Sequence, residues 1–214
     1  WNDFDALNQY VARCQSFLQD SSPDNDVLLY YPIYDRFSTP GEEMIEHFDG
    51  IGKQFDNSAF KRGAEAMLHK GYAFDYLSDK QMGNVVIEGG KLITEGKSQY
   101  STIVIPKVEY IPIATLQKMI SLAEEGATVI ALEGLPASFA GYGRYEENKK
   151  AFETGMRELE NGKQVTPGVN EIKVGKGRII EGDSLDILLK YASIRRETFQ
   201  NNGIQFLRKK RSDG

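Results

Sequence analysis

The stretch that most constrains the fold runs from Tyr100 to Gly134. It contains two apolar runs, Ser101–Pro106 and Ala127–Leu132, and between them the segment Ile113–Glu125 has apolar residues at helical spacing. Continuous apolar runs are typical of strands buried on both faces, as in a parallel sheet covered by helices. A strand, a helix and a second strand in this order predict a βαβ unit and hence an α/β protein.

Strand and helix signals alternate on both sides of this unit. Three further apolar runs predict parallel strands at Asp26–Tyr31, Tyr72–Tyr76 and Gly177–Ile180. Together with the two central runs they give a mostly parallel five-stranded sheet. For this sheet we expect the flavodoxin-like order 2-1-3-4-5 within a three-layer α/β/α sandwich.

The remaining elements follow from caps and turn residues. A Gly89–Gly90 turn predicts a small β-hairpin insertion, and Gly71 marks the end of a helix that begins after Ser58. We expect helices over 3–19, 38–48, 58–70, 145–161 and from 184, short strands over 171–174 and 204–207, and a loop over 164–170.

Composition excludes some classes of partner. The chain has 214 residues and a net charge of −5, which argues against nucleic acid and anionic membranes as partners. Apolar runs stay shorter than the roughly 20 residues that cross a bilayer, so no membrane insertion is expected. Because the chain starts without methionine and ends on Asp213–Gly214, we interpret it as a piece of a longer protein.

In a flavodoxin-like sheet, ligands bind at the carboxyl ends of strands one and three, where the winding reverses. This rule brings Tyr34 and Asp35, after strand one, opposite Glu109 and Tyr110, after strand three, with Asp75 at the end of strand two. These five residues are our candidates for substrate contact. Acidic side chains at strand ends are common, so catalysis by them is the minor interpretation.

The sequence offers no nucleophile at the usual place. Flavodoxin-like hydrolases and amidotransferases hold one on a tight turn after strand three, but here strand three runs into Pro106–Glu109. Cys14 lies on the apolar face of the first predicted helix, where we expect a packed, inert thiol. His47 and His69 lie in predicted helices without a serine or cysteine partner.

Ligand motifs are incomplete as well. Gly50–Lys53 lacks the spacing of a phosphate-binding loop, and the acidic cluster Asp24–Asp26 lacks the glycine and distant glutamate of a calcium loop. We therefore expect no cofactor and no metal in this segment.

Several motifs, in their order along the chain, resemble the part of the α-L-rhamnosidase-type glycoside hydrolases (family 106) that follows the catalytic barrel. The resemblance spans almost the whole chain. The motifs are Tyr10–Gln19, Pro23–Pro32, Gly71–Ser78, Ile103–Pro106, Gly126–Val129, Gly203–Lys209 and Asp213–Gly214.

The resemblance implies an amidotransferase-like domain that has lost its chemistry, with residues 1–20 as the helix that leaves a barrel, 21–203 as the α/β domain and 204–214 as the start of a β domain. It implies no catalytic residue here, calcium only elsewhere in the parent protein, and a periplasmic or extracellular location. The expected partners are the neighbouring barrel and β-sandwich of the same chain, and an oligosaccharide.

The function we expect is that of a non-catalytic accessory domain that supports or lines the sugar cleft of a secreted glycoside hydrolase acting on complex polysaccharide. Two alternatives stay open. The chain could be an autonomous module that binds carbohydrate or protein, because aromatic side chains at strand ends stack on sugars. It could also be a flavodoxin-like hydrolase, which would need a reactive thiol.

Overall fold

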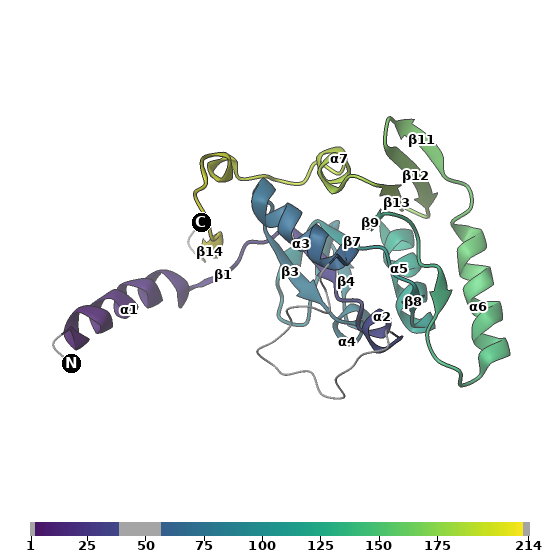
Figure 1. Cartoon of the computed structure of the whole chain (residues 1–214), viewed down its shortest axis with the longest axis horizontal. Helices are drawn as coiled ribbons and strands as arrows, with labels where there is room; N and C mark the ends of the chain where they lie inside the picture. The colour runs from purple at the N-terminus through teal and green to yellow at the C-terminus, as the bar shows by residue number, and fades with distance from the viewer. Residues whose placement is uncertain (1–2, 39–56, 212–214) are drawn as a thin grey trace.

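A computed structural model describes residues 3–38 and 57–211, and its centre is a seven-stranded sheet (Figure 1). The strands, in spatial order, are β11 (Lys163–Thr166), β12 (Val169–Val174), β13 (Gly177–Gly182), β9 (Thr128–Leu132), β7 (Thr102–Ile105), β2 (Val27–Tyr30) and β3 (Phe74–Leu77). The five strands from β13 to β3 are parallel to one another, whereas β12 pairs antiparallel with both β13 and β11.

The α/β class is confirmed, but the sheet is mixed and two strands larger than predicted. The expected loop over 164–170 instead carries most of β11 and the start of β12. Three of the four residues of β11 are exposed, so this strand shows no apolar run in the sequence.

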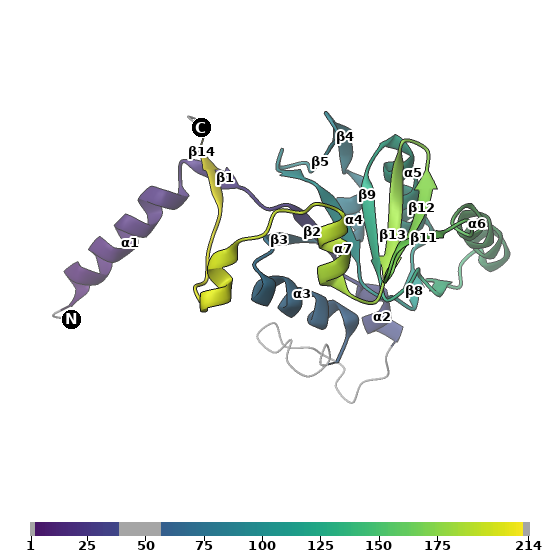
Figure 2. The same ribbon diagram turned by 90° about the horizontal axis from the view of Figure 1, so that it is seen from above.

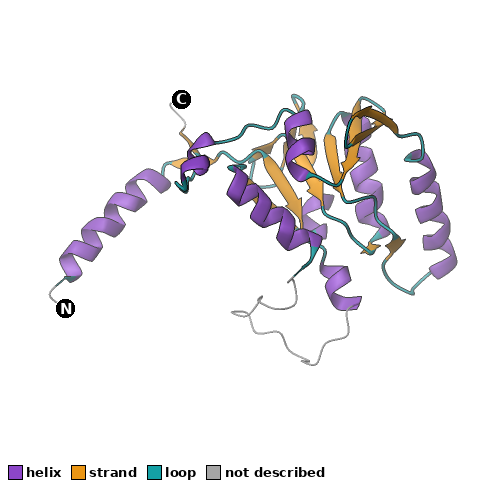
Figure 3. Cartoon of the chain, turned by 45° about the horizontal axis from the view of Figure 1, so that its top comes forward, coloured by secondary structure: helices purple, strands orange, loops and turns teal. Residues whose placement is uncertain are grey.

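Helices cover both faces of the sheet (Figures 2 and 3). Strand residues alternate between the faces: Leu28 and Ile103 belong to one buried cluster, and Leu29 and Val104 to the other. The first cluster is closed by α4 (Asp79–Gly83), α5 (Ile113–Glu125) and α6 (Tyr145–Glu158), and the second by α3 (Ala59–Lys70) and α7 (Leu185–Tyr191). The main core therefore consists of two apolar layers with the sheet between them.

The predicted ends of α3 are confirmed. The Ser58 side chain accepts a hydrogen bond from the Lys61 amide at 3.1 Å, and Gly71 ends the helix with φ of +82°. A Cβ at Gly71 would lie 2.1 Å from the Glu197 carbonyl oxygen, so glycine is required there both for its φ and for the close approach.

The predicted hairpin is confirmed and extended. It consists of β4 (Val86–Glu88) and β5 (Lys91–Ile93), and β6 (Gln99–Tyr100) adds a third antiparallel strand. Tyr100 leads directly into β7, so this small sheet lies beside the start of a central strand.

The first helix, α1 (Phe4–Leu18), extends away from the rest of the described chain (Figure 1). None of its residues is buried among the described residues and Cys14 is half-buried, so the packed, inert thiol expected there stays a prediction. After α1, β1 (Ser21–Pro23) pairs antiparallel with β14 (Lys209–Arg211).

The strand predicted over 204–207 is wrong. The 3-10 helix η1 (Thr198–Asn202) comes before this segment, and the strand begins only at Lys209. The helix predicted over 38–48, with His47, and the Gly50–Lys53 segment lie outside the described residues, apart from Ser38 at the end of α2 (Ile33–Ser38). No helix in the described ranges is both long and apolar enough to span a bilayer.

The Glu171 carboxylate on β12 makes the stability of the folded chain depend on pH in the acid range. Its carboxylate accepts hydrogen bonds from the Tyr191 hydroxyl and the Arg178 guanidinium, both at 2.9 Å. The bond from Tyr191, together with Arg178, lowers the pKa of Glu171 despite its partial burial. A lowered folded-state pKa means that the unfolded chain takes up a proton first as the pH falls. The stabilisation is therefore present above the ordinary glutamate pKa of about 4.3 and is lost as the pH falls through the lower folded value.

We therefore expect Glu171→Gln to reduce the loss of stability between about pH 6 and about pH 3. Urea unfolding at several pH values measures this. Glu158→Gln, at an exposed position on α6, is the control and should leave the acid dependence unchanged. Equal acid dependence in the Glu171 variant and the unaltered chain would contradict the prediction.

Candidate functional site

The carboxyl ends of β2 and β7 are joined by Asp35. This residue lies on α2, directly after β2. Its carboxylate accepts hydrogen bonds from the backbone amides of Glu109, at 3.1 and 2.9 Å, and of Tyr110, at 2.7 Å. The structure therefore brings together Tyr34, Asp35, Glu109 and Tyr110, four of the five candidates. Whether they contact a substrate stays a prediction.

The geometry gives Asp35 a positioning role. Both of its oxygens bind backbone N–H groups, and such charge-assisted bonds fix the segment that follows β7. That segment continues into β8 (Tyr110–Ile111), which pairs in parallel with β10 (Ser138–Phe139).

Two aromatic rings lie on the same short helix as Asp35. Tyr34 is 37% exposed and Phe37 is 74% exposed, and their ring centroids are 6.1 Å apart in an edge-to-face arrangement. Phe37 was not among the sequence candidates. Its exposure could not be read from the sequence because the helix α2 itself was not predicted there.

A buried polar cluster joins the ends of β2, β3 and α5. The hydroxyls of Tyr30 and Thr115 donate to the same oxygen of Asp79, at 2.7 and 2.6 Å. Desolvation by burial, with the bond to Asp79, raises the pKa of Tyr30, so this phenol stays neutral. Both hydroxyls are committed to Asp79, which gives the cluster a structural role. Asp79 was not among the sequence candidates, and its signal is an acidic residue in the first turn of a helix that follows a strand.

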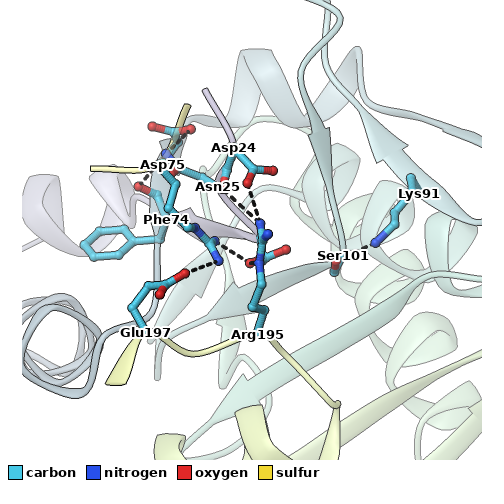
Figure 4. Close-up of polar contacts among 10 residues, drawn as sticks. Asp24, Asn25, Phe74, Asp75, Lys91, Ser101, Arg195 and Glu197 are labelled. Carbon is cyan, nitrogen blue, oxygen red and sulfur yellow. Dashed lines mark hydrogen bonds and ion pairs between the residues drawn. The ribbon is translucent and has the colours of Figure 1, made fainter. Parts of the chain in front are cut away.

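Asp75 does not belong to this site. β3 continues to Leu77, so Asp75 lies inside the strand rather than at its end. Its carboxylate accepts a hydrogen bond from the Asn25 amide at 2.8 Å (Figure 4). It accepts a second one from the Tyr100 hydroxyl, also at 2.8 Å. Asn25 precedes β2 and Tyr100 precedes β7, so these bonds hold Asp75 toward the amino ends of the strands. The prediction that Asp75 lies near Asp35 was wrong. The strand was expected over Tyr72–Tyr76, which puts Asp75 near its end, but β3 begins at Phe74 and Asp75 is its second residue.

The segment after β7 carries no thiol or hydroxyl nucleophile. Pro106 is buried and Lys107 is exposed. Of the residues considered for activation, His69 is exposed on α3 and Cys14 lies on α1. Within residues 3–38 and 57–211, no group of three His, Cys, Asp or Glu side chains is placed to hold a metal ion.

Replacing Asp35 by alanine should loosen the segment 107–111. The change removes hydrogen bonds from two backbone amides to a charged group, which are worth about 1.5–3 kcal/mol each where they are sheltered from water and less at this exposed position. Faster amide hydrogen exchange at Glu109 and Tyr110 measures the effect. Asp183→Ala, an exposed carboxylate just after β13, is the matched control. Unchanged exchange at both amides would rule out the positioning role.

Comparison with protein families gives a match over the entire chain. The model of glycoside hydrolase family 106, described as alpha-L-rhamnosidase, matches residues 1–214. Among curated proteins, a putative beta-glucuronidase from Formosa agariphila is 26% identical over 130 residues, which cover 61% of this chain and 9% of that protein.

Among solved structures, a rhamnosidase from Novosphingobium sp. PP1Y matches 88% of this chain with a TM-score of 0.59 and 21% identity. A β-galactosidase from Rahnella sp. R3 matches 95% of this chain with a TM-score of 0.53 and 12% identity. At these identities the likeness concerns the fold. This chain spans 16% of the rhamnosidase chain and 38% of the β-galactosidase chain, so it corresponds to a part of each.

Proposed function

This chain belongs to glycoside hydrolase family 106, the alpha-L-rhamnosidases, and from that premise we propose that it is a non-catalytic accessory domain of a longer, exported glycoside hydrolase acting on complex polysaccharide. In this proposal the hydrolytic residues, and any calcium, belong to other parts of the parent protein. The domain supports a neighbouring catalytic barrel and lends side chains to its sugar cleft.

The observation that carries the proposal is the segment after β7. In flavodoxin-like enzymes of the amidotransferase type, this position holds the attacking group on a tight turn. Here Pro106 and Lys107 occupy it, and the Asp35 carboxylate is committed to the backbone amides beyond them. A segment fixed in this way can shape a neighbouring site, but at this position it offers no thiol or hydroxyl that could attack a substrate.

The finer fold assignment is part of the same proposal. Taken by themselves, the five parallel strands lie in the order β3-β2-β7-β9-β13, which favours a flavodoxin-like, amidotransferase-like domain over residues 21–203. Residues 204–214 then begin a following β domain.

The exposed helix α1 supports the proposed contact with a preceding barrel. Its large apolar side chains are between 40% and 75% exposed: Phe4, Leu7, Tyr10, Val11, Phe17 and Leu18. A 15-residue helix is only marginally stable in water without tertiary contacts. We propose that residues 1–20 form the helix by which the chain leaves the barrel, with the apolar stripe packed against it.

The first test of the proposal is hydrolysis. The isolated chain should release no product from an aryl α-L-rhamnoside or from a rhamnose-containing pectin fragment, while the full-length parent protein serves as the positive control. Turnover by the isolated chain that Asp35→Ala or Glu109→Ala abolishes would overturn the proposal.

The second test asks whether the domain lines the sugar cleft. In the full-length parent, Tyr34→Ala and Glu109→Ala should raise KM several-fold with little change in kcat, because they remove contacts that bind substrate and transition state equally. Phe199→Ala, at an aromatic side chain 58% exposed on η1, is the control. Unchanged KM in the Tyr34 and Glu109 variants would limit the domain to a supporting role.

A binding module is the second candidate function. Phe37 is 74% exposed on α2 and Tyr142 is 93% exposed on the loop after β10, and exposed aromatics of this kind stack on sugar rings. A glycan array with the isolated chain distinguishes this function. Signal for a defined glycan that Phe37→Ala removes would favour an autonomous module, and an empty array would remove that candidate.

A further inference from the structure

A polar depression of about 1050 Å³ lies at the opposite end of the strands, near the amino ends of β2 and β7. Figure 4 labels Asp24, Lys91, Ser101 and Arg195 from its lining. Its walls are β1 with residues 24–26, the turn before β6, Arg195 from the segment after α7, and β14. Its volume is just above the range of about 300–1,000 Å³ that is usual for small-molecule pockets, so it has room for an oligomeric ligand. Because none of its lining residues is aromatic, it suits neither an apolar ligand nor sugar stacking.

The depression is basic although the chain as a whole is acidic. Five lysine and arginine side chains line it, against three aspartates, while the whole chain has a net charge of −5. A local excess of positive charge in a concave surface attracts anions.

Two of the three aspartates are already neutralised by arginines. Arg195 binds Asp24 at 2.6 Å and Asp26 at 3.4 Å, and Arg208 also binds Asp26. Arg208 lies behind this wall with its side chain only 10% exposed, and its Nε is a buried polar atom without a hydrogen-bond partner in the described chain. Asp24 and Asp26 are thus already neutralised and do not cancel the positive charge of the other lining side chains.

Three lysines face the depression without an acidic partner. Lys91 donates to the Ser101 hydroxyl at 2.8 Å, and no ion pair joins Lys91, Lys97 or Lys210 to a carboxylate among residues 3–38 and 57–211. Three like charges around one hollow repel one another, and an anionic ligand would relieve this repulsion.

We propose that this depression binds an acidic oligosaccharide, with sugar carboxylates or sulfates at Lys91, Lys97 and Lys210. The hydroxyl and amide groups that line the rest of the hollow, on Ser22, Ser98 and Gln99, suit the hydroxyl groups of a glycan. This depression is separate from the candidate site around Asp35 at the carboxyl ends of β2 and β7. The proposal for it does not depend on the accessory role proposed above.

The test is calorimetric titration of the 214-residue chain with a hexamer of galacturonic acid. A sulfated hexasaccharide is the second arm, and it shows whether carboxylate or sulfate binds better. A neutral maltohexaose, inorganic phosphate and a hexaglutamate peptide complete the set. We expect binding of at least one acidic glycan that weakens with added salt, and no binding of the neutral glycan.

Two triple variants with the same change in charge decide whether the site is this depression. Lys91→Gln, Lys97→Gln and Lys210→Gln together should weaken binding about tenfold or more, equivalent to about 1.4 kcal/mol. Lys149→Gln, Lys150→Gln and Lys176→Gln, all exposed and outside the depression, should change affinity less than about twofold, as expected of distant screened charges.

Several results would overturn the proposal. They are equal weakening by the two triple variants, equal binding of maltohexaose, absence of binding by either acidic glycan, and equally tight binding of phosphate or the acidic peptide. None of these results bears on the hydrolysis assays, so the site and the accessory role can fail independently.

Discussion

Gly177→Ala is expected to lower the free energy of unfolding by about 3 kcal/mol, at the upper end of the usual cost of overpacking. A Cβ at this position would lie 2.3 Å from the Ala127 carbonyl oxygen and 2.4 Å from that of Ala123. Real Cβ atoms essentially never approach other atoms this closely, and both neighbours are backbone atoms that no rotamer change can move aside.

The cost is high because two tight turns pack backbone against backbone. One turn ends α5 at Gly126, and the other joins β12 to β13. The two turns are hydrogen-bonded to each other through the backbone. The Lys176 amide donates to the carbonyl oxygen of Glu124 at 2.9 Å, and the Arg178 amide donates to that of Ala127 at 3.0 Å. Moving one turn would break these bonds and would separate β13 from β9.

Chemical denaturation of the variant and the unaltered chain measures the loss. Gly96→Ala is the matched control, because a Cβ there would meet no atom within 4 Å and its φ is not in the left-handed region. The control should stay within about 0.5 kcal/mol of the unaltered chain, as surface changes usually do. Equal midpoints for Gly177→Ala and Gly96→Ala would contradict the packing argument.

The parallel strands and α5 could be predicted because burial on two faces leaves a signal in the local sequence. β2, β7 and β9 are almost wholly buried, so each is an unbroken apolar run. β11 leaves no such signal because it is mostly exposed, and α2 and α4 are too short, at six and five residues, for a helical period to appear.

The candidate site was partly predictable for a similar reason. The rule that ligands bind where the winding of the sheet reverses depends only on strand order, so it placed Asp35 near Glu109. It could not show that the Asp35 carboxylate binds backbone amides, because that depends on how α2 turns after β2. Asp75 was misplaced by an error in a strand boundary, the least reliable part of such predictions.

Contacts between the N-terminal and C-terminal parts of the chain were not predictable. β1 pairs with β14 across nearly the whole sequence. The arginines that pair with Asp24 and Asp26 come from the C-terminal part of the chain, whereas the two aspartates come from the N-terminal part. Neither the two strands nor the paired side chains lie in a local sequence pattern that indicates the partner. The arginine that pairs with the acidic cluster Asp24–Asp26 lies about 170 residues away, so the sequence around the cluster gives no sign of it.

Asp26→Ala should release β14 from β1. The Asp26 side chain is 16% exposed and accepts bonds from Arg208, which is 10% exposed, and from Arg195. Removing one partner of a buried ion pair costs about 3–5 kcal/mol, because the remaining charge is left buried without compensation. Among the described residues, the Arg208 guanidinium would keep only the ion pair with Glu197, at 3.4 Å, so moving into water becomes favourable for it.

The loss should appear as local opening rather than global unfolding. β1 and β14 form a two-stranded ribbon outside the main sheet, so they can separate while the seven strands stay paired. The basic run from Arg208 to Arg211 is a substrate for trypsin once it is released. If the change lowers the free energy of separating β14 from β1 by about 3 kcal/mol, cleavage at this basic run should accelerate by roughly a hundredfold.

Limited proteolysis with mass spectrometry measures the cleavage at this run, and circular dichroism checks that the main sheet persists. Asp20→Ala is the control, since this carboxylate is exposed at the end of α1. If trypsin cuts the Asp26 and Asp20 variants at the same rate, the ion pairs do not hold the ribbon. If it cuts as expected, Asp26 also fixes the direction in which α1 leaves the domain, because α1 continues directly into β1. The same carboxylate would then hold the basic depression together and position the helix that we propose to dock on the barrel.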